Sequence, residues 1–210
     1  LQTLSKAPYL DKPLTIDDLA SLRRELDIEQ DNIEGWFMPE TYSYTVGSTS
    51  RDILRRAHNE MKSYLDKNWK SRDPSLPYDS PYQALIMASI IEKETAKVDE
   101  RPRIASVFVN RLQKKMKLQT DPTVIYGVKD RYDGNIRRRD LEDENPYNTY
   151  VIEGLPPTPI AMPGKGAVKA ALHPDKTNFL YFVAKGGGAH QFSTTLAEHN
   201  HAVKRYVLEQ

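Results

Sequence analysis

The central stretch of this 210-residue sequence reads Ser80-Pro-Tyr-Gln-Ala-Leu-Ile-Met-Ala-Ser-Ile-Ile-Glu-Lys-Glu94. Ser80 can cap a helix, and Pro81 suits the first helical position, where the backbone needs no N–H donor. Residues 84–91 are apolar almost throughout, which predicts a helix that is buried on most of its sides. We therefore expect the rest of the chain to pack around this helix.

Two glutamates, Glu92 and Glu94, close the helix. At about 100° per residue they point nearly opposite ways, and Glu94 falls on the bulkier, more apolar side. A carboxylate there is costly unless it is paired, protonated or used in chemistry. Two interpretations have similar support: Glu94 is an acid catalyst, or the end of the helix becomes polar and Glu94 pairs with Lys97 or Arg101.

The composition excludes several classes of function. The 30 basic and 29 acidic residues nearly cancel, which argues against nucleic acid or an anionic membrane surface as a partner. The basic runs 111–117 and 137–139 are interpreted as solvated faces or loops. With no cysteine there is no disulfide or thiolate chemistry. His199 and His201 are two apart on an expected helix and cannot share a face, so we expect no metal site and no cofactor.

The pattern of residues predicts an α+β chain, mainly helical, with a small antiparallel sheet. A capping-box spacing at 15–18 predicts a helix to about Leu26, and Ser50 can cap the next one. Two strands at 179–183 and 189–194 flank Lys185-Gly-Gly-Gly188, a hairpin signal. Further helices are expected at 99–117, 121–127 and 167–172, and from the capping box at Thr195 to about Leu208. Residues 128–166 should form a long irregular segment, which in a compact domain usually has a function.

Several sequence blocks, taken together, identify a family. They are Glu34 to Tyr42 (EGWFMPETY), Ala88 to Ala96 (ASIIEKETA), Ala105 to Leu112 (ASVFVNRL), Leu118 to Gly127 (LQTDPTVIYG), Tyr147 to Tyr150 (YNTY) and Gly154 to Pro157 (GLPP). The set closely resembles the YceG-like family, the endolytic murein transglycosylases, over essentially the whole chain. One block alone would be weak evidence, whereas several long blocks in the same order are specific.

The resemblance implies a lysozyme-like catalytic domain that covers residues 1–210, with a helical N-terminal part (1–79) and a catalytic core (80–210). It further implies a bacterial enzyme held at the inner membrane that faces the periplasm or the cell exterior. A membrane anchor and a LysM-like module would precede this chain, which begins at Leu1 rather than Met. The implied partners are peptidoglycan glycan strands and, in the cell, peptidoglycan synthases such as penicillin-binding proteins.

In that family the catalytic acid is the second glutamate of Glu-Lys-Glu, which is Glu94 here, the residue that helical periodicity also selects. Such enzymes cut the MurNAc–GlcNAc bond without water and leave a 1,6-anhydro end. The looser counterparts of substrate-binding blocks in other lytic transglycosylases are Gln119, Thr120, Asp121, Tyr126, Tyr147, Asn148 and Tyr150.

Some of these substrate-binding assignments have structural alternatives. Core packing explains Tyr126 as well as a sugar contact does, and a helix cap explains Asp121 equally well. Asn110 and Arg111 follow an apolar stripe, so an internal salt bridge or hydrogen bond is expected for them.

Two other functions remain open from the sequence. A lysozyme-type hydrolase would need a second carboxylate near Glu94, and Glu92, Asp99 and Asp121 are the candidates. The other possibility is a non-catalytic module that binds glycan or serves as an assembly scaffold.

Overall fold

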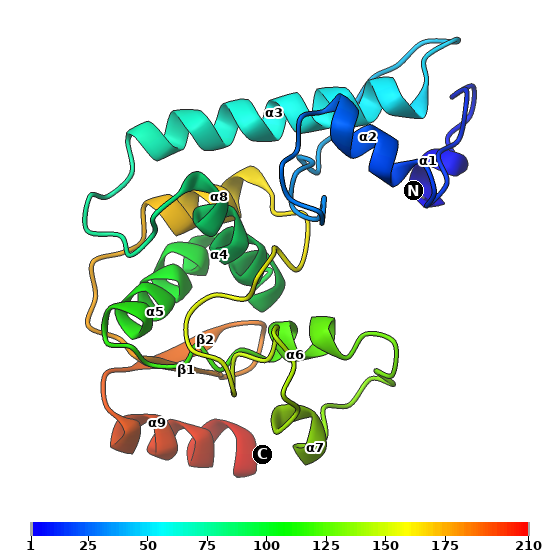
Figure 1. Cartoon of the computed structure of the whole chain (residues 1–210). Helices are drawn as coiled ribbons and strands as arrows, with labels where there is room; N and C mark the ends of the chain where they lie inside the picture. Colours follow the sequence, from blue (N-terminus) through cyan, green and yellow to red (C-terminus); the bar gives the residue numbers. More distant parts are fainter. Residues whose placement is uncertain (1, 210) are drawn as a thin grey trace.

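The structure is a computed structural model that describes residues 2–209, and it confirms an α+β fold that is mainly helical (Figure 1). The longer helices are α2 (Leu19–Glu25), α3 (Ser50–Lys70), α4 (Pro81–Glu94), α5 (Arg101–Gln113), α6 (Asp121–Gly127), α8 (Lys165–Leu172) and α9 (Leu196–Val203). Shorter turns are α1 (Gln2–Ser5), a 3₁₀ turn (Val98–Glu100), α7 (Arg138–Leu141) and a π-helical turn (Lys204–Leu208). The strands β1 (Tyr181–Ala184) and β2 (His190–Ser193) pair antiparallel.

Helix α4 is the buried centre of the fold, as its sequence predicts. Ser80 Oγ accepts a hydrogen bond from the backbone N–H of Gln83, and Pro81 occupies the first turn. Every residue from 84 to 91 is buried. Helices α3, α5, α6 and α8 all pack against α4. These contacts hold α4 in place, together with the end that carries Glu94.

Two hydrophobic clusters share one long helix. The main cluster surrounds α4 and takes Met61 and Leu65 from the C-terminal half of α3. The smaller cluster gathers Leu22, Phe37 and their neighbours around Ala57, in the N-terminal half of α3. Figure 1 shows α3 extending over both regions. The N-terminal part therefore packs on the same helix as the catalytic core.

The predicted hairpin, β1 and β2, packs against α9 and, through β1, against α5. Phe182 of β1 lies edge-on against Phe108 of α5, with ring centroids 5.7 Å apart. Positive φ angles at Gly186, Gly187 and Gly188 make the turn. The Thr195 capping box is confirmed, because its hydroxyl accepts from Glu198 N and the Glu198 carboxylate accepts from Thr195 N. In Figure 1 the hairpin lies between α5 and α9.

Two predicted helix starts are wrong by a few residues. At 15–18, Asp18 accepts hydrogen bonds from Thr15 N and Oγ1, which closes a turn, and α2 begins only at Leu19. The cap of α3 is Thr49 rather than Ser50, since Thr49 and Asp52 form a reciprocal capping box. The first error arises because hydroxyl and carboxylate side chains can close a turn as well as cap a helix, and the second arises because Thr49 and Ser50 are adjacent hydroxyl residues, either of which could cap.

Helix α5 is shorter than the predicted 99–117. A 3₁₀ turn precedes it, and Pro102 sits in its first turn. It ends at Gln113 because Lys115 has a positive φ of 55°, which stops a right-handed helix. Residues 128–166 are largely irregular, as expected, apart from the single turn of α7 and the first two residues of α8, which begins at Lys165 rather than at the predicted residue 167. Within residues 2–209, no helix combines the length and the apolar character that crossing a membrane requires.

Candidate active site

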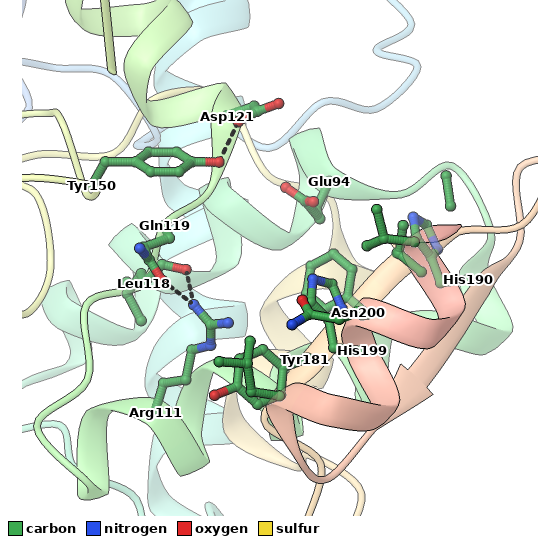
Figure 2. A pocket seen from close by; sticks show the side chains of 15 residues that line it. Glu94, Arg111, Leu118, Gln119, Asp121, Tyr150, Tyr181, His190, His199 and Asn200 are labelled. Carbon is green, nitrogen blue, oxygen red and sulfur yellow. Dashed lines mark hydrogen bonds between the residues drawn. The ribbon is translucent and has the colours of Figure 1, made fainter. Parts of the chain in front are cut away.

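A cavity of about 540 Å³ opens at the C-terminal end of α4 (Figure 2). The end of α4 and the segment that leads into α6 form one side of it, and the hairpin and α9 form the other. The lining includes Glu94, Arg111, Leu118, Gln119, Asp121, Tyr150, Tyr181, His190, His199 and Asn200. This volume lies within the usual range for small-molecule sites.

Glu94 is the last residue of α4 and is partly buried. Its Oε2 accepts a 2.7 Å hydrogen bond from the hydroxyl of Thr120. No basic side chain of residues 2–209 forms an ion pair with it. Burial is the main cause of a raised pKa for Glu94, to which the charge of Asp121 adds, while the Thr120 hydrogen bond and His190 oppose the rise.

Glu92 points away from the cavity and has a structural role. Its Oε1 accepts a hydrogen bond of 2.9 Å from Arg101 Nη2, and its Oε2 accepts one of 3.0 Å from the backbone N–H of Gly164. The alternative in which Glu94 pairs with Arg101 is therefore wrong, because Arg101 pairs with Glu92. The two glutamates therefore have different partners, Arg101 and Gly164 for Glu92 and Thr120 for Glu94.

A network of threonines holds Thr120 against Glu94. The Thr120 side chain is buried, and its backbone N–H donates to Thr149 Oγ1 over 3.0 Å. The hydroxyls of Thr123 and Thr149 are 2.8 Å apart. The Thr120 hydroxyl is therefore buried and bonded to the carboxylate of Glu94, and it is not exposed in the cavity. Thr149 was missed as a site residue, although it lies inside the Tyr147–Tyr150 block.

Gln119, Asp121 and Tyr150 line the cavity with Glu94. The hydroxyl of Tyr150 donates to Asp121 Oδ1 over 2.7 Å, a bond drawn in Figure 2. Burial raises the pKa of Tyr150, and the bond to Asp121 raises it further. Gln119 adopts a left-handed φ of 49°, and its Oε1 accepts from Arg111. Asp121 is the first residue of α6, so it stands both at a helix start and in the cavity.

Besides Thr120, three of the predicted substrate-binding residues do not line this cavity. The rings of Tyr126 and Tyr147 pack on each other, with centroids 4.8 Å apart, and against the main core. The Tyr126 hydroxyl accepts a hydrogen bond from Asn32 Nδ2. Asn148 is buried, and its amide group donates to the backbone carbonyls of 140, 141 and 143, which ties down the irregular segment.

The hairpin and α9 contribute a cavity wall that the sequence did not reveal. His190 of β2 contacts Glu100 at hydrogen-bond distance, with Nδ1 2.8 Å from Oε2. The rings of Tyr181 and His199 stack with centroids 5.2 Å apart. These residues carry no motif of their own, and only long-range packing brings them to Glu94. Among residues 2–209 there is no group of three or more metal-ligating side chains suited to hold an ion.

Comparison with known proteins agrees with this architecture. The model of the YceG-like family matches residues 2–205. The chain is 45% identical over 176 residues to a protein of Bacillus subtilis named endolytic murein transglycosylase, and it covers 48% of that protein. It is 30% identical to a protein of the same name from Streptococcus pneumoniae, of which it covers 36%. The chain thus spans about half the length of these relatives, or less.

A solved structure supports the same relationship. A YceG-like protein from Listeria monocytogenes superimposes with a TM-score of 0.74 at 34% sequence identity, over 92% of this chain and 65% of that one. The family match, the sequence identity and the shared fold agree over nearly the whole chain, and the chain belongs to the YceG-like family.

Proposed function

We propose that this chain is the catalytic part of an endolytic peptidoglycan lytic transglycosylase. It would cut the β-1,4 bond between MurNAc and GlcNAc within glycan strands and leave 1,6-anhydroMurNAc ends. The observation that carries the proposal is Glu94, a carboxyl group with a raised pKa and no ion-pair partner among residues 2–209, at the edge of a cavity large enough for sugar rings. The names of the relatives from Bacillus and Streptococcus support the same substrate.

One carboxyl group is enough for the proposed reaction. Protonated Glu94 donates its proton to the glycosidic oxygen, and the bond from that oxygen to the anomeric carbon of MurNAc breaks. The 6-hydroxyl of the same MurNAc attacks the anomeric carbon, and the Glu94 carboxylate takes the hydroxyl proton. The intramolecular attack replaces water as nucleophile, because a tethered hydroxyl has a high effective concentration. Glu94 ends protonated and ready for the next cycle.

The surroundings of Glu94 suit both halves of this cycle. Burial keeps the acid form populated by raising the pKa. The Thr120 hydroxyl stabilises the carboxylate that remains after the proton has left. Because the hydrogen bond orients one oxygen, the other oxygen of Glu94 is the one available to the substrate.

A lysozyme-type hydrolase is the second candidate, and one observation favours it: Asp121 lines the same cavity as Glu94. A second carboxylate can activate water or trap a glycosyl-enzyme. Glu92 does not serve this purpose because Arg101 and Gly164 occupy its oxygens. Asp99 does not line the cavity either.

The mass of the products distinguishes the two reactions. We expect each new MurNAc end to be the anhydro form, one water lighter than a reducing end, and to carry no oxygen from water enriched in the heavy isotope. Incorporation of that isotope at the new ends would establish hydrolysis and direct attention to Asp121. Binding of glycan strands without any cleavage would instead indicate a binding or assembly module.

Replacing Glu94 tests the assignment of the acid. Glu94→Gln keeps the side-chain volume and removes the transferable proton, so the cleavage rate should fall by about 10²–10⁴. Glu92→Gln is the matched control on the same helix and should cost far less activity. Full activity of a folded Glu94→Gln variant would contradict the proposal.

We also propose the cellular setting that the family resemblance implies. The catalytic part would act outside the cytoplasm, held at the inner membrane by an anchor that belongs to the longer protein. Peptidoglycan synthases are the expected partners there, because newly made glycan strands are the substrate to be cut.

A further inference from the structure

The side chain of Arg111 is a buried cation with no charged partner in the part of the chain that the structure describes. Its exposed fraction is 8%. Nε donates to the carbonyl of Leu180 over 2.6 Å, and Nη1 donates to the carbonyls of Lys117 and Leu118 and to the side-chain oxygen of Gln119. These bonds confirm the predicted internal role of Arg111. All four acceptors are neutral, and no carboxylate of residues 2–209 forms an ion pair with Arg111.

The remaining nitrogen of the guanidinium, Nη2, has no hydrogen-bond partner among the described residues. Arg111 lines the cavity of Glu94, and Figure 2 shows its guanidinium beside Gln119 and Tyr181, with Glu94 farther along the same cavity. A buried charge is costly unless something compensates it. The bonds of Nε and Nη1 explain how Arg111 holds the backbone, but they leave the charge and Nη2 unexplained.

The neighbours of Arg111 do not supply a negative charge. The ring of Tyr181 lies 5.1 Å from its central carbon and offers only a π face. Burial and the charge of Arg111 both lower the pKa of His199, and an imidazole carries no negative charge with or without its second proton. Asp121 already accepts the hydroxyl of Tyr150. The positive charge is therefore open to an anion that enters the cavity.

We propose, building on the proposed function, that Arg111 binds a carboxylate of the glycan strand while the neighbouring glycosidic bond lies at Glu94. Arginine N–H groups form strong, charge-assisted hydrogen bonds with carboxylates. A strand offers two sources of this group: the lactyl carboxylate of MurNAc units that have lost their peptide, and the carboxylates of the stem peptides. Arg111 would then select which units of a strand are presented for cleavage.

The test varies the substrate as well as the protein. Strands stripped of peptide are compared with the same strands after their lactyl carboxylates have been converted to methylamides. Peptide-bearing strands are treated in the same way. We expect conversion of the recognised carboxylate to lower kcat/KM of the wild-type chain by about 10-fold to 100-fold, the range of a charge-assisted hydrogen bond. The type of strand that shows this loss, peptide-free or peptide-bearing, identifies whether Arg111 recognises the lactyl carboxylate or a carboxylate of the stem peptide.

The variant Arg111→Gln should abolish the difference between acid and amide substrates. A purely structural role would lower kcat/KM for both substrates equally and keep their ratio, which would overturn the proposal. Arg103→Gln, which removes a half-exposed charge from the same helix, should keep the wild-type ratio. If Arg111→Gln does not fold, Arg111→Lys is used in its place because it retains the charge. Independently of any variant, a wild-type chain whose kcat/KM is unchanged by both conversions overturns the proposal.

Binding separates this inference from the proposed reaction. The affinity of the Glu94→Gln chain for the same four substrates is measured by calorimetry, which needs no cleavage. A loss of affinity on amidation supports the role of Arg111 even if the products prove to be those of a hydrolase. Equal affinity for acid and amide strands refutes it, whatever the products are.

Discussion

The contact between Thr120 and Glu94 limits a rise in the pKa of Glu94 that burial causes. Burial and the nearby charge of Asp121 raise the pKa of Glu94, and the Thr120 hydroxyl moderates the rise because it donates to the carboxylate form. A general acid must be protonated at the working pH and still release its proton. The residues around Glu94 therefore have opposing effects on one carboxyl group.

Removal of this hydrogen bond should shift the pH dependence of activity. Thr120→Val keeps the branched shape and loses the donor, so the carboxylate is less stable and the pKa of Glu94 rises. Because the protonated form is the active acid, the alkaline limb of kcat/KM should move to higher pH. Rates measured across pH on wild type and variant test this.

Ser106→Ala is the matched control for the loss of a buried hydroxyl, since Ser106 bonds to Arg103 and Thr177 outside the cavity. It should leave the limb in place. A shift of the Thr120→Val limb to lower pH would mean that Thr120 does not stabilise the carboxylate.

At the scale of elements, Glu92 joins three helices. It lies in the last turn of α4, its ion pair reaches Arg101 at the start of α5, and its second oxygen accepts a hydrogen bond from the backbone N–H of Gly164 at the start of α8. Arg101 is largely buried, with a side-chain exposure of 12%. The end of α4 that carries Glu94 is thus fixed by the other glutamate.

Neutralising Glu92 should destabilise the fold more than it affects catalysis. Glu92→Gln leaves Arg101 without its counter-charge, and we expect a loss of about 1–3 kcal/mol in the free energy of unfolding. Urea titration followed by circular dichroism measures this loss. An unchanged unfolding midpoint would show that the ion pair adds no stability.

The loop before α3 packs tightly on the segment after the Gly154–Pro157 block. Gly35 has a φ of 86°, and a Cβ placed there would stand 2.6 Å from the ring of Pro159. Gly47 has a similar φ of 89° with nothing within 4 Å. The two glycines share their backbone conformation and differ in packing.

Alanine at these two positions should separate backbone strain from steric conflict. Gly47→Ala is expected to cost about 1–2 kcal/mol from the positive φ alone. Gly35→Ala adds an overlap worth about another 1–3 kcal/mol. Equal losses in the free energy of unfolding would mean that Pro159 moves aside freely.

At the scale of the whole molecule, the N-terminal part and the core are joined at several points. Helix α3 supplies Ala57 to one cluster and Met61 to the other, and Trp36 packs on both. Asn32 donates hydrogen bonds to Tyr126 and Thr158 of the core. These contacts couple residues 2–79 to residues 80–209.

We therefore expect a single cooperative unfolding transition. In a Trp69→Phe variant, fluorescence reports on Trp36 at the junction, while circular dichroism reports on all helices. Coincident urea curves by the two probes indicate one unit. Two separate transitions would show that the two parts unfold independently and that the shared helix does not couple them.

The sequence by itself determined those features that depend on neighbours along the chain. The cap at Ser80 and the apolar run of α4 lie within a few residues of each other, and the hairpin follows from Gly186, Gly187 and Gly188 between two apolar strands. Glu94 was predicted by the helical period and by the family blocks, and the structure places it in a cavity. Each of these signals is local, because helix and turn geometry is set over one or two turns of backbone.

Only the tertiary structure decided which partners these side chains have. His190 meets Glu100 from 90 residues away, and Arg111 meets Leu180 from 69 residues away. Arg101 pairs with Glu92 rather than Glu94, and Asn148 turns its amide to the backbone rather than to the cavity. The physical reason is that a cavity is made by segments that approach through core packing, and neither periodicity nor capping specifies which distant side chains will meet.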